Sequence, residues 1–395
     1  MSWSVMHHSN YVTNQEPKGS LPYSIIGVDR QFCDYSLQSG KFRKRKTFYD
    51  AVKVGEEIQR LDPRLVVSHV SDNGFSHLVT LICKRIGIPA CALSVCPFWP
   101  GRQYLLDPLR MLPLNMQSIG KYLQVDKRLN SSEPTFCPQL SISKYNKISK
   151  FWGRGFRFNR NIFGILKDFF IALKRYRFQF ILGLLISWNK KTKHYSQCIN
   201  SASECRKFLL ALHMQPEAML LCGDNRFADS ANLCEWISYN MPLDAAMVVK
   251  EHPAQFFRTL SFHNRLSALP NVVYYSGVSG VSEILEDFEI VFVVSGNAGF
   301  EALQRGLKVV IFDEAFFSGC PNVYTFDFNV RLDDFLAHVI EQPIQPLSHV
   351  NDWMASYELW LYDNSVAVSE QDLIGKSFET GIKRLEALYE IYQVI

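Results

Sequence analysis

One glycine turn in the second half of the sequence carries residues that could bind a phosphate. The segment SGNAGFEA contains Ser295, Gly296, Asn297 and Gly299, and Glu301 is its last polar residue. The glycines would let the backbone approach a ligand, and Ser295 and Asn297 offer side-chain hydrogen bonds. The N–H groups of a following helix would point at an anion, and Glu301 could accept hydrogen bonds from a ribose diol. The alternative is an ordinary strand-to-helix turn with an acidic residue favoured by the helix dipole.

Two further polar stretches precede this turn, and all three would converge if their strands are neighbours in one sheet. The first is a loop that contains Asp224 and Asp229, and the second is Lys-Glu-His-Pro, which contains Lys250 and His252. Asp229 has a plain alternative as the N-cap of the next helix, and His252 could simply shape a strand end before Pro253.

The glycine turn lies inside a predicted strand, turn, helix and strand unit. An apolar, β-branched run from Ile290 to Val294 is typical of a strand buried on both faces, and helical spacing starts at Ala298. The helix should end at Gly306, before a second buried strand from Lys308 to Phe312. Such a unit packs right-handed in a parallel sheet, so its turn falls at the carboxyl edge, where open α/β sheets bind ligands.

The rest of the second half alternates between predicted strands and helices. We expect a connecting helix over Ser196 to Leu212, a first strand at Ala218 to Cys222 and a helix ending near Tyr239. Further strands are expected at Ala245 to Lys250 and at Val272 to Tyr275, with a short helix at Val281 to Asp287. This alternation predicts an α/β domain with a parallel sheet.

The first half contains a second unit of the same kind. Arg64 to His69 reads as a strand, Phe75 to Ile86 as a helix and Ala90 to Val95 as a strand. In the turn between the first strand and the helix, Asp72 either caps the helix or faces a cleft and acts on an acceptor hydroxyl. A strand is expected at Tyr23 to Val28, a helix from about Thr47 to Leu61, and a long loop with Trp99, Arg102 and Arg110 after Val95.

Composition limits the class of protein. With 47% hydrophobic and 20% charged residues, the chain is an ordinary globular protein, long enough at 395 residues for two domains. Its ten cysteines include no CxxC pair, so they predict reduced core residues in a cytoplasmic protein, and no zinc or other metal site is expected. We expect neither an export signal nor a membrane span.

The positive charge gathers in one stretch. Residues 144–193 hold thirteen Lys and Arg and a single acid, Asp168, so this segment carries a net charge of +12 and the remainder carries −8. Its apolar and aromatic residues are mixed with the cations, as in helices that lie on anionic lipid. We therefore expect contact with an anionic membrane surface, with a core helix that has a basic outer face as the alternative. No nucleic-acid motif accompanies the charge.

The order of the motifs resembles a known family. A strand that ends in K-x-H-P, followed about forty residues later by S-G-x-x-G-x-E-A, is similar to the C-terminal domain of the capsular polysaccharide biosynthesis glycosyltransferases, which include retaining β-Kdo transferases. The resemblance is good over 218–315 and faint over 62–110. It implies a GT-B fold of two doubly wound, Rossmann-like α/β domains that face a cleft, with a nucleotide-sugar donor in the second.

The resemblance also implies roles for single residues. His252 would contact the phosphate or nucleotide of the donor, Ser295 and Gly296 would hold the phosphate, and Glu301 would bind the ribose. Asp229 would lie near the anomeric carbon, where a carboxylate can act as nucleophile or stabilise an oxocarbenium-like centre. Two departures from the family pattern, Gly223-Asp224 in place of a common Gln and Glu251 in place of a common Pro, leave the donor and the stereochemical outcome open.

These observations predict four regions: an acceptor-side domain at 1–143, a basic connection at 144–212, a nucleotide-sugar domain at 213–350, and C-terminal helices at 351–395 that pack back across the domains. The expected function is transfer of a sugar from a nucleotide donor, CMP-Kdo being one option, to a capsular or lipopolysaccharide glycan or glycolipid. The enzyme would need no cofactor and would be cytoplasmic and peripheral to the membrane. Alternatives are a nucleotide-sugar epimerase, a polyol-phosphate polymerase, or a catalytically silent assembly subunit.

Overall fold

The protein divides into two compact units. In the computed structural model, unit 1 comprises Met1–Cys137, Pro216–Asn225 and Asp352–Ile395, and unit 2 comprises Pro138–Gln215 and Arg226–Asn351. The structure describes residues 51–69, 74–96, 102–123, 205–213, 229–252, 260–275 and 280–367, and the shorter pieces 12–13, 26–27, 47–49, 227, 255, 258 and 387–388.

Unit 2 is built on a six-stranded parallel sheet. Its strands are β7 (Arg206–Ala211), β8 (Ala245–Lys250), β9 (Val272–Tyr275), β10 (Ile290–Val293), β11 (Lys308–Ile311) and β12 (Val323–Thr325). They lie in the order β12-β11-β10-β7-β8-β9, and every neighbouring pair is parallel. The chain therefore builds the sheet outward from β7 in one direction and then returns to add β10 on its other side. This is the doubly wound arrangement, with its switch point between β7 and β10.

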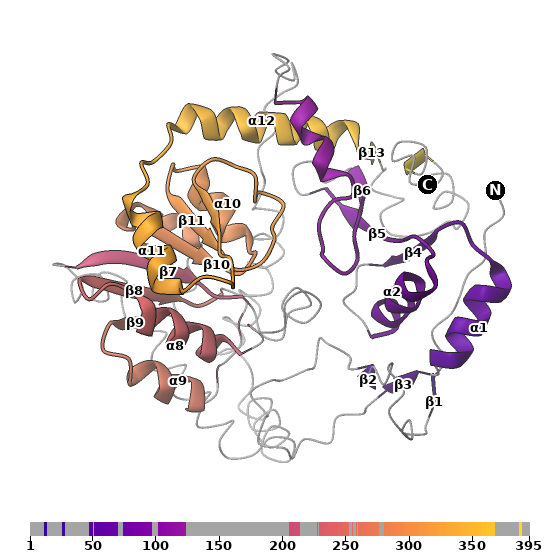
Figure 1. Ribbon diagram of the computed structural model, residues 1–395, viewed down its shortest axis with the longest axis horizontal. Helices are drawn as coiled ribbons and strands as arrows, with labels where there is room; N and C mark the ends of the chain where they lie inside the picture. Colours follow the sequence, from indigo (N-terminus) through magenta and orange to yellow (C-terminus); the bar gives the residue numbers. More distant parts are fainter. Residues whose placement is uncertain are drawn as a thin grey trace, which may run out of the picture. The chain divides into compact units, whose positions relative to one another are not determined.

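Helices cover both faces of this sheet. The pairs α8 (Ser230–Asn240) with α9 (Leu260–Ser267), and α8 with α11 (Leu332–Glu341), lie in contact, whereas α10 (Asn297–Leu303) packs on β10, β11 and η6 (Val281–Glu283). Figure 1 draws α10 on the other side of the sheet from α8 and α9. Right-handed crossovers require this change of side when the winding direction reverses.

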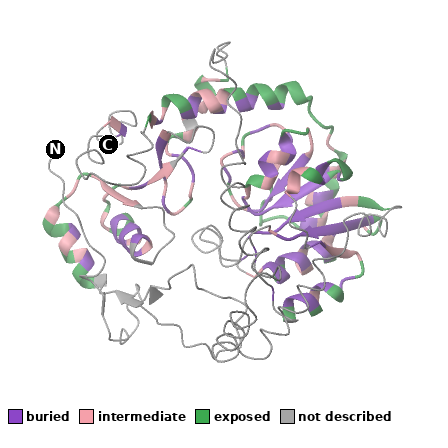
Figure 2. Cartoon of the chain, turned by 180° about the vertical axis from the view of Figure 1, so that it is seen from behind, coloured by how far each residue is buried: buried purple, intermediate pink, exposed green. Residues whose placement is uncertain are grey.

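The strands of unit 2 form its core. All residues of β8, β10 and β11 are buried, as is expected of strands covered on both faces (Figure 2). The predicted strands at 245–250, 272–275, 290–294 and 308–312 are thus confirmed, and so is the helix between the last two. The predicted helix at 281–287 is two short 3₁₀ turns, η6 and η7 (Leu285–Asp287).

One prediction in this unit was wrong. A connecting helix was expected over Ser196 to Leu212. The end of that range is instead β7, the central strand of the sheet, at Arg206–Ala211. The strand expected at Ala218 to Cys222 lies outside the described residues. The strand β7 thus lies before the predicted domain start at 213, and the predicted domain limits stay predictions.

Unit 1 contains the second predicted strand, helix and strand unit. The strands β4 (Val66–His69) and β5 (Ala90–Val95) are parallel, and α2 (Gly74–Ile86) connects them. In this sheet β6 (Arg102–Leu106) then pairs antiparallel with β5, so part of the segment predicted as a long loop is a strand. The α/β class is confirmed, while the sheet that contains β4, β5 and β6 is mixed rather than wholly parallel.

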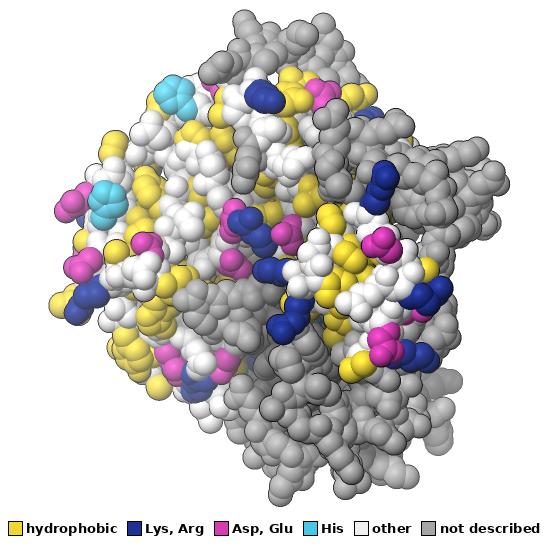
Figure 3. Space-filling model, turned by 45° about the vertical axis from the view of Figure 1, so that its right-hand side comes forward, with side chains coloured by type: hydrophobic (Ala, Val, Ile, Leu, Met, Phe, Trp, Pro, Cys, Tyr) yellow, Lys and Arg dark blue, Asp and Glu magenta, His cyan; other side chains and the backbone are white. Residues whose placement is uncertain are grey.

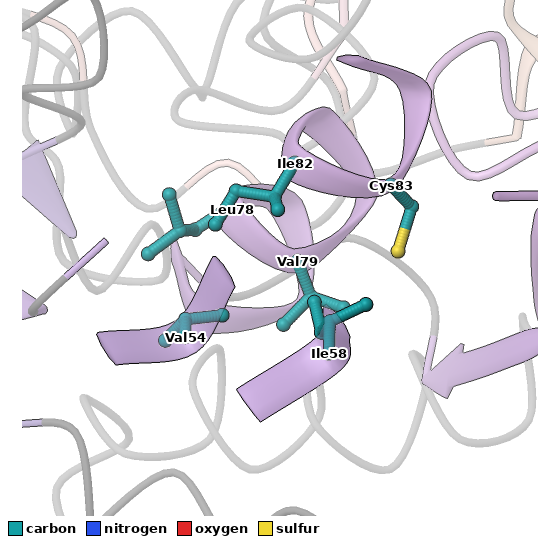
Figure 4. Packing of buried hydrophobic residues seen from close by; sticks show 6 residues of the cluster. All are labelled: Val54, Ile58, Leu78, Val79, Ile82 and Cys83. Carbon is teal, nitrogen blue, oxygen red and sulfur yellow. The ribbon is translucent and has the colours of Figure 1, made fainter. Parts of the chain in front are cut away.

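A helix pair makes the core beside this sheet. The buried face of α1 (Ala51–Leu61) packs on α2, and the cluster consists of Val54, Ile58, Leu78, Val79, Ile82 and Cys83 (Figure 4). The helix predicted from Thr47 starts later, because β3 (Thr47–Tyr49) pairs antiparallel with β1 (Val12–Thr13) and β2 (Ile26–Gly27).

The C-terminal segment completes unit 1. After α12 (Leu347–Asp363), the strand β13 (Val366–Ala367) pairs antiparallel with β6. The guanidinium of Arg102 donates to the Ser365 hydroxyl at 2.7 Å and to the Tyr362 carbonyl at 2.9 Å, and it lies over the Tyr362 ring. Arg102 therefore anchors the returning chain, and the predicted loop residue Trp99 lies outside the described residues.

The basic stretch 144–193 also lies outside the described residues. Among the helices that the structure does describe, none combines the length and apolar character needed to cross a membrane. On the face shown in Figure 3, acidic and basic side chains of the described residues lie close together. The expected contact with anionic lipid through 144–193 therefore stays a prediction.

Candidate functional site

The predicted glycine turn and the predicted imidazole lie level with each other at one edge of the unit 2 sheet. In β10, Phe292 is opposite Leu210 of β7, which in turn is opposite Val249 of β8. Three residues beyond each of these positions, the chain reaches Ser295, His213 and His252. All three strands are parallel, so these residues follow their strands at the same carboxyl edge, around the switch point.

His213 joins the ends of β7 and β10. The backbone N–H of Ser295 donates to Nε2 of His213 at 3.4 Å. A Cβ atom added at Gly296 would lie 3.1 Å from the same nitrogen, so the imidazole packs directly on the glycine backbone. Since Nε2 accepts this hydrogen bond, the neutral ring carries its proton on Nδ1. The buried His213 thus holds the glycine turn.

The two glycines of the turn have different surroundings. Gly299 is buried, and a Cβ atom there would lie 2.8 Å from the Phe317 ring and 3.0 Å from Val293. It allows close packing of α10 on the sheet, and its predicted approach to a ligand stays a prediction. Asn297, the first residue of α10, is exposed. The N-cap residue of this helix is Gly296, so no side chain caps the first N–H groups of α10.

Glu301 lies on α10 and faces η6. Burial raises the pKa of its carboxyl group, and the Arg305 charge and a hydrogen bond from the Ser282 backbone amide oppose this rise. The side chain is half-buried. Its carboxylate therefore has one backbone donor from the chain between β9 and β10, and the predicted contact with a ribose stays a prediction.

Lys250 is turned into the protein. Only 2% of the residue is exposed, and its ammonium group donates to the Glu251 carbonyl at 2.9 Å and lies 5.2 Å from the centre of the Tyr275 ring. Burial lowers the pKa of Lys250 to about 8, against the attraction of the Glu251 and Glu283 carboxylates. In this arrangement the ammonium group supports the end of β8 from within, and direct contact with a substrate is an untested prediction.

Glu251 points to the other face of the sheet, as alternation along a strand requires. Its carboxylate pairs with Arg258 through two bonds, at 2.7 and 2.8 Å, and also accepts from the Tyr274 hydroxyl and the His252 backbone amide, each at 2.8 Å. Burial opposes ionisation of Glu251, but the Arg258 charge and these donors lower its pKa overall. The same guanidinium donates to the His213 carbonyl at 3.0 Å.

The two predicted catalytic acids have different outcomes. Asp229 caps α8 by accepting from the Ala231 amide at 2.9 Å, and it pairs with Arg265 of α9 at 3.0 Å. These contacts fulfil the plain alternative, and its catalytic role stays a prediction. Asp72 and Asp224 lie outside the described residues, so the structure does not place either of them.

Two residues of this edge were not among the predicted ones. His213 could have been found, because it follows the wholly apolar run Phe208 to Leu212, and a polar residue directly after a buried strand belongs to the carboxyl edge. Arg258 has no such signal, because it lies alone after two phenylalanines and its partners are distant in sequence.

A hollow of about 310 Å³ occurs elsewhere, in unit 1. It borders Ala90, the first residue of β5, and Asp107, which directly follows β6, with Lys84 and Arg110 among its lining residues. This is the amino edge of β5, opposite to the edge at which α/β sheets bind ligands. None of the predicted site residues lines it.

Comparison with known protein families finds a match over part of the chain. Residues 199–321 match the family model described as capsule polysaccharide biosynthesis protein. The matched region starts before β7 and ends after β11, so it contains the three strand ends that meet at the switch point. No protein of curated function matches the sequence.

Several solved structures are similar at low identity. Two of them are structures of KpsC from Thermosulfurimonas dismutans. The structure described as a β-Kdo 2,4-transferase has 14% identity, covers 74% of this chain and 78% of its own, and has a TM-score of 0.36. The structure described as a β-Kdo 2,7-transferase has 11% identity, covers 77% of this chain and 80% of its own, and has a TM-score of 0.38. The UDP-GlcNAc 2-epimerase of Methanocaldococcus jannaschii in complex with UDP-GlcNAc and UDP has 12% identity, covers 79% of this chain and 78% of its own, and has a TM-score of 0.33.

Proposed function

We propose that this protein transfers a sugar from a nucleotide-activated donor to a growing capsular or lipopolysaccharide glycan. The observation that carries the proposal is the level placement of Ser295, His213 and His252 at the switch point of a doubly wound sheet. This is the place where such sheets bind nucleotides, and imidazole and backbone N–H groups are suited to a phosphate.

The proposed donor lies with its phosphate at the glycine turn and its ribose toward Glu301. His252 and the exposed Asn297 would contact the phosphate, while the buried His213 holds the turn through Ser295. The departing phosphate would be stabilised by these groups without a metal ion. The match of residues 199–321 to the capsule polysaccharide biosynthesis family model supports a role in capsule polysaccharide synthesis. The donor sugar, the acceptor and peripheral membrane binding through 144–193 belong to the proposal.

The first test is binding of nucleotides. A ligand that binds the native state raises its stability by about 2.7 kcal/mol when its concentration is a hundred times its Kd. We expect one of CMP, CDP, UDP and GDP to raise the melting temperature. His252→Ala and Glu301→Ala should remove this rise, whereas His349→Ala and Glu341→Ala, which change exposed residues of α12 and α11, should keep it.

The second test is turnover with the matching nucleotide sugar. Transfer to a glycan acceptor that is lost in His252→Ala supports the proposal. Full activity in both His252→Ala and Glu301→Ala would remove the assigned donor site. Turnover of the donor in the absence of any acceptor would indicate an epimerase, and nucleotide binding without turnover would indicate a silent assembly subunit.

A further inference from the structure

One buried ion pair joins the ends of three neighbouring strands of unit 2. The side chains of Arg258 and Glu251 are only 3% and 5% exposed, with 2.7 Å between Nε and Oε2. Glu251 follows β8, and its partner Tyr274 is in β9. Through Arg258 the pair also reaches the carbonyl of His213, which follows β7. Arg258 further donates to the Ser230 hydroxyl, at the start of α8, at 3.5 Å.

The hydrogen bonds of Glu251 are fully used. Oε1 accepts from the His252 amide and from Nη2 of Arg258, and Oε2 accepts from Nε of Arg258 and from the Tyr274 hydroxyl. A carboxylate with two donors on each oxygen has one orientation only. The backbones of His252 and His213 are therefore attached to the same rigid group, one through an N–H and one through a carbonyl.

A buried ion pair of this kind is a poor way to gain stability. Removing two charges from water is costly, and apolar residues of similar size are often as stable or more so, although removal of one partner alone is strongly destabilising. The pair does, however, form hydrogen bonds with the backbones of two histidines near the switch point. Glu251 accepts from the His252 amide, and Arg258 donates to the His213 carbonyl.

We infer that the Glu251–Arg258 pair is a positioning device that fixes His213 and His252 at the carboxyl edge of the sheet. Its effect on nucleotide binding rests on the proposed function, but its effect on the histidines does not. Neither Glu251 nor Arg258 needs to touch the substrate. Their role is to hold the backbone from which the two imidazoles extend.

The test replaces the whole polar group by apolar residues in the full-length chain. The variant Glu251→Leu/Arg258→Met/Tyr274→Phe leaves no single charge behind. The matched control, Arg206→Gln/Asp244→Asn, removes the ion pair of 3.3 Å that joins the amino ends of the same strands, β7 and β8. Both variants are compared with the native protein by circular dichroism and by nitrogen NMR of histidine side chains, assigned with His213→Gln and His252→Gln.

In the native protein, the signals of His213 should be those of the Nδ1–H tautomer without any ligand. The apolar variant should fold but show a mixture of tautomers for His213 and a shifted His252, and the control should match the native protein. Nucleotide affinity should fall about ten- to a hundredfold in the apolar variant, by analogy with the loss that follows removal of the groups behind a metal ligand. Unchanged histidine signals in a folded apolar variant would show that the pair is merely structural.

Two further outcomes are informative. If the apolar variant does not fold, Tyr274→Phe removes one of the four hydrogen bonds to Glu251 and leaves the ion pair in place. It should then shift the His252 signals, and signals identical to the native ones would overturn the inference. If the native protein binds no nucleotide, the proposed function fails, while the histidine signals still decide whether the pair positions these residues.

Discussion

The imidazole of His213 packs against Gly296 so closely that a methyl group on that glycine would lie 3.1 Å from Nε2 and 3.2 Å from Cε1. His213 follows β7, the central strand of the sheet, and Gly296 is the N-cap of α10, the helix after the neighbouring strand, β10. The contact therefore spans the switch point. The shape of the glycine turn depends on this ring, which also accepts from the Ser295 amide.

Gly296→Ala should weaken nucleotide binding without unfolding the protein. The added methyl group would require the His213 ring, which accepts from Ser295, to move by a few tenths of an ångström, so the turn that would hold the phosphate should change its shape. Calorimetry with the nucleotide found by thermal shift measures the loss.

A double-mutant cycle supplies the control for this prediction. In His213→Ala the space beside Gly296 is vacant, so adding Gly296→Ala should cost little more. Strictly additive losses would mean that the two positions act independently and that the contact does not matter for binding.

Gly299→Ala should destabilise unit 2. Its methyl group would lie 2.8 Å from the Phe317 ring and 3.0 Å from Val293, both fully buried, so α10 must shift away from the sheet. Overpacking of this kind costs about 1–3 kcal/mol. The free energy of unfolding in urea measures it, with Gly120→Ala as the control, because a Cβ there has no atom within 4 Å. Equal stability of both variants would show that the packing around Gly299 yields easily.

The sequence was sufficient for the unit that carries the glycine turn. Ile290 to Val293 is a short β-branched run with a glycine turn after it, and the next apolar run, Lys308 to Ile311, follows a glycine at 306 with φ of 74°. Both signals are local, so the strand, helix and strand could be read without knowing their partners. The parallel pair β4 and β5 was predicted for the same reason.

The central strand could not be placed in this way. The run Phe208 to Leu212 is short and apolar, and periodicity alone does not decide whether such a run is a strand. The answer comes from pairing of β7 with β8 and β10, which follow it by tens of residues. Pairing with β5 and with the distant β13 makes β6 a strand although prolines surround it.

The candidate site shows the same division. Ser295, Gly296 and His252 were predicted from residue type and from their place after a strand, and the register puts them level. The Glu251–Arg258 pair was not predicted, because the partners of a buried charge are set by the fold. Gly299 was assigned to a ligand, whereas its neighbours are Phe317 and Val293, a distinction that only packing reveals.

Two variants of Asp229 separate a catalytic role from a structural one. Asp229→Ala removes the N-cap of α8 and the contact with Arg265, and loss of a cap costs about 1 kcal/mol of stability. Asp229→Asn keeps a capping oxygen but has no charge. If Asp229 acts at the anomeric carbon, both variants lose turnover while Asp229→Asn keeps most of the stability. Turnover that merely follows stability in the two variants would contradict the catalytic role.

Lys250 should make the stability of the protein depend on pH in the alkaline range. Burial lowers its pKa to about 8, compared with 10.5 for an unperturbed lysine. Between these values the unfolded chain holds the proton that the folded protein has released, so the free energy of unfolding rises with pH. Below about pH 8 the buried charge lowers the free energy of unfolding by its full amount, and by pH 10.5 this destabilisation has disappeared. The change in the free energy of unfolding is about 3 kcal/mol. Urea unfolding of the native protein and Lys250→Met across this range should show the native protein gaining stability relative to the variant. The exposed Lys121→Met serves as the control and should follow the native curve, and a constant difference between the native protein and Lys250→Met would contradict the prediction.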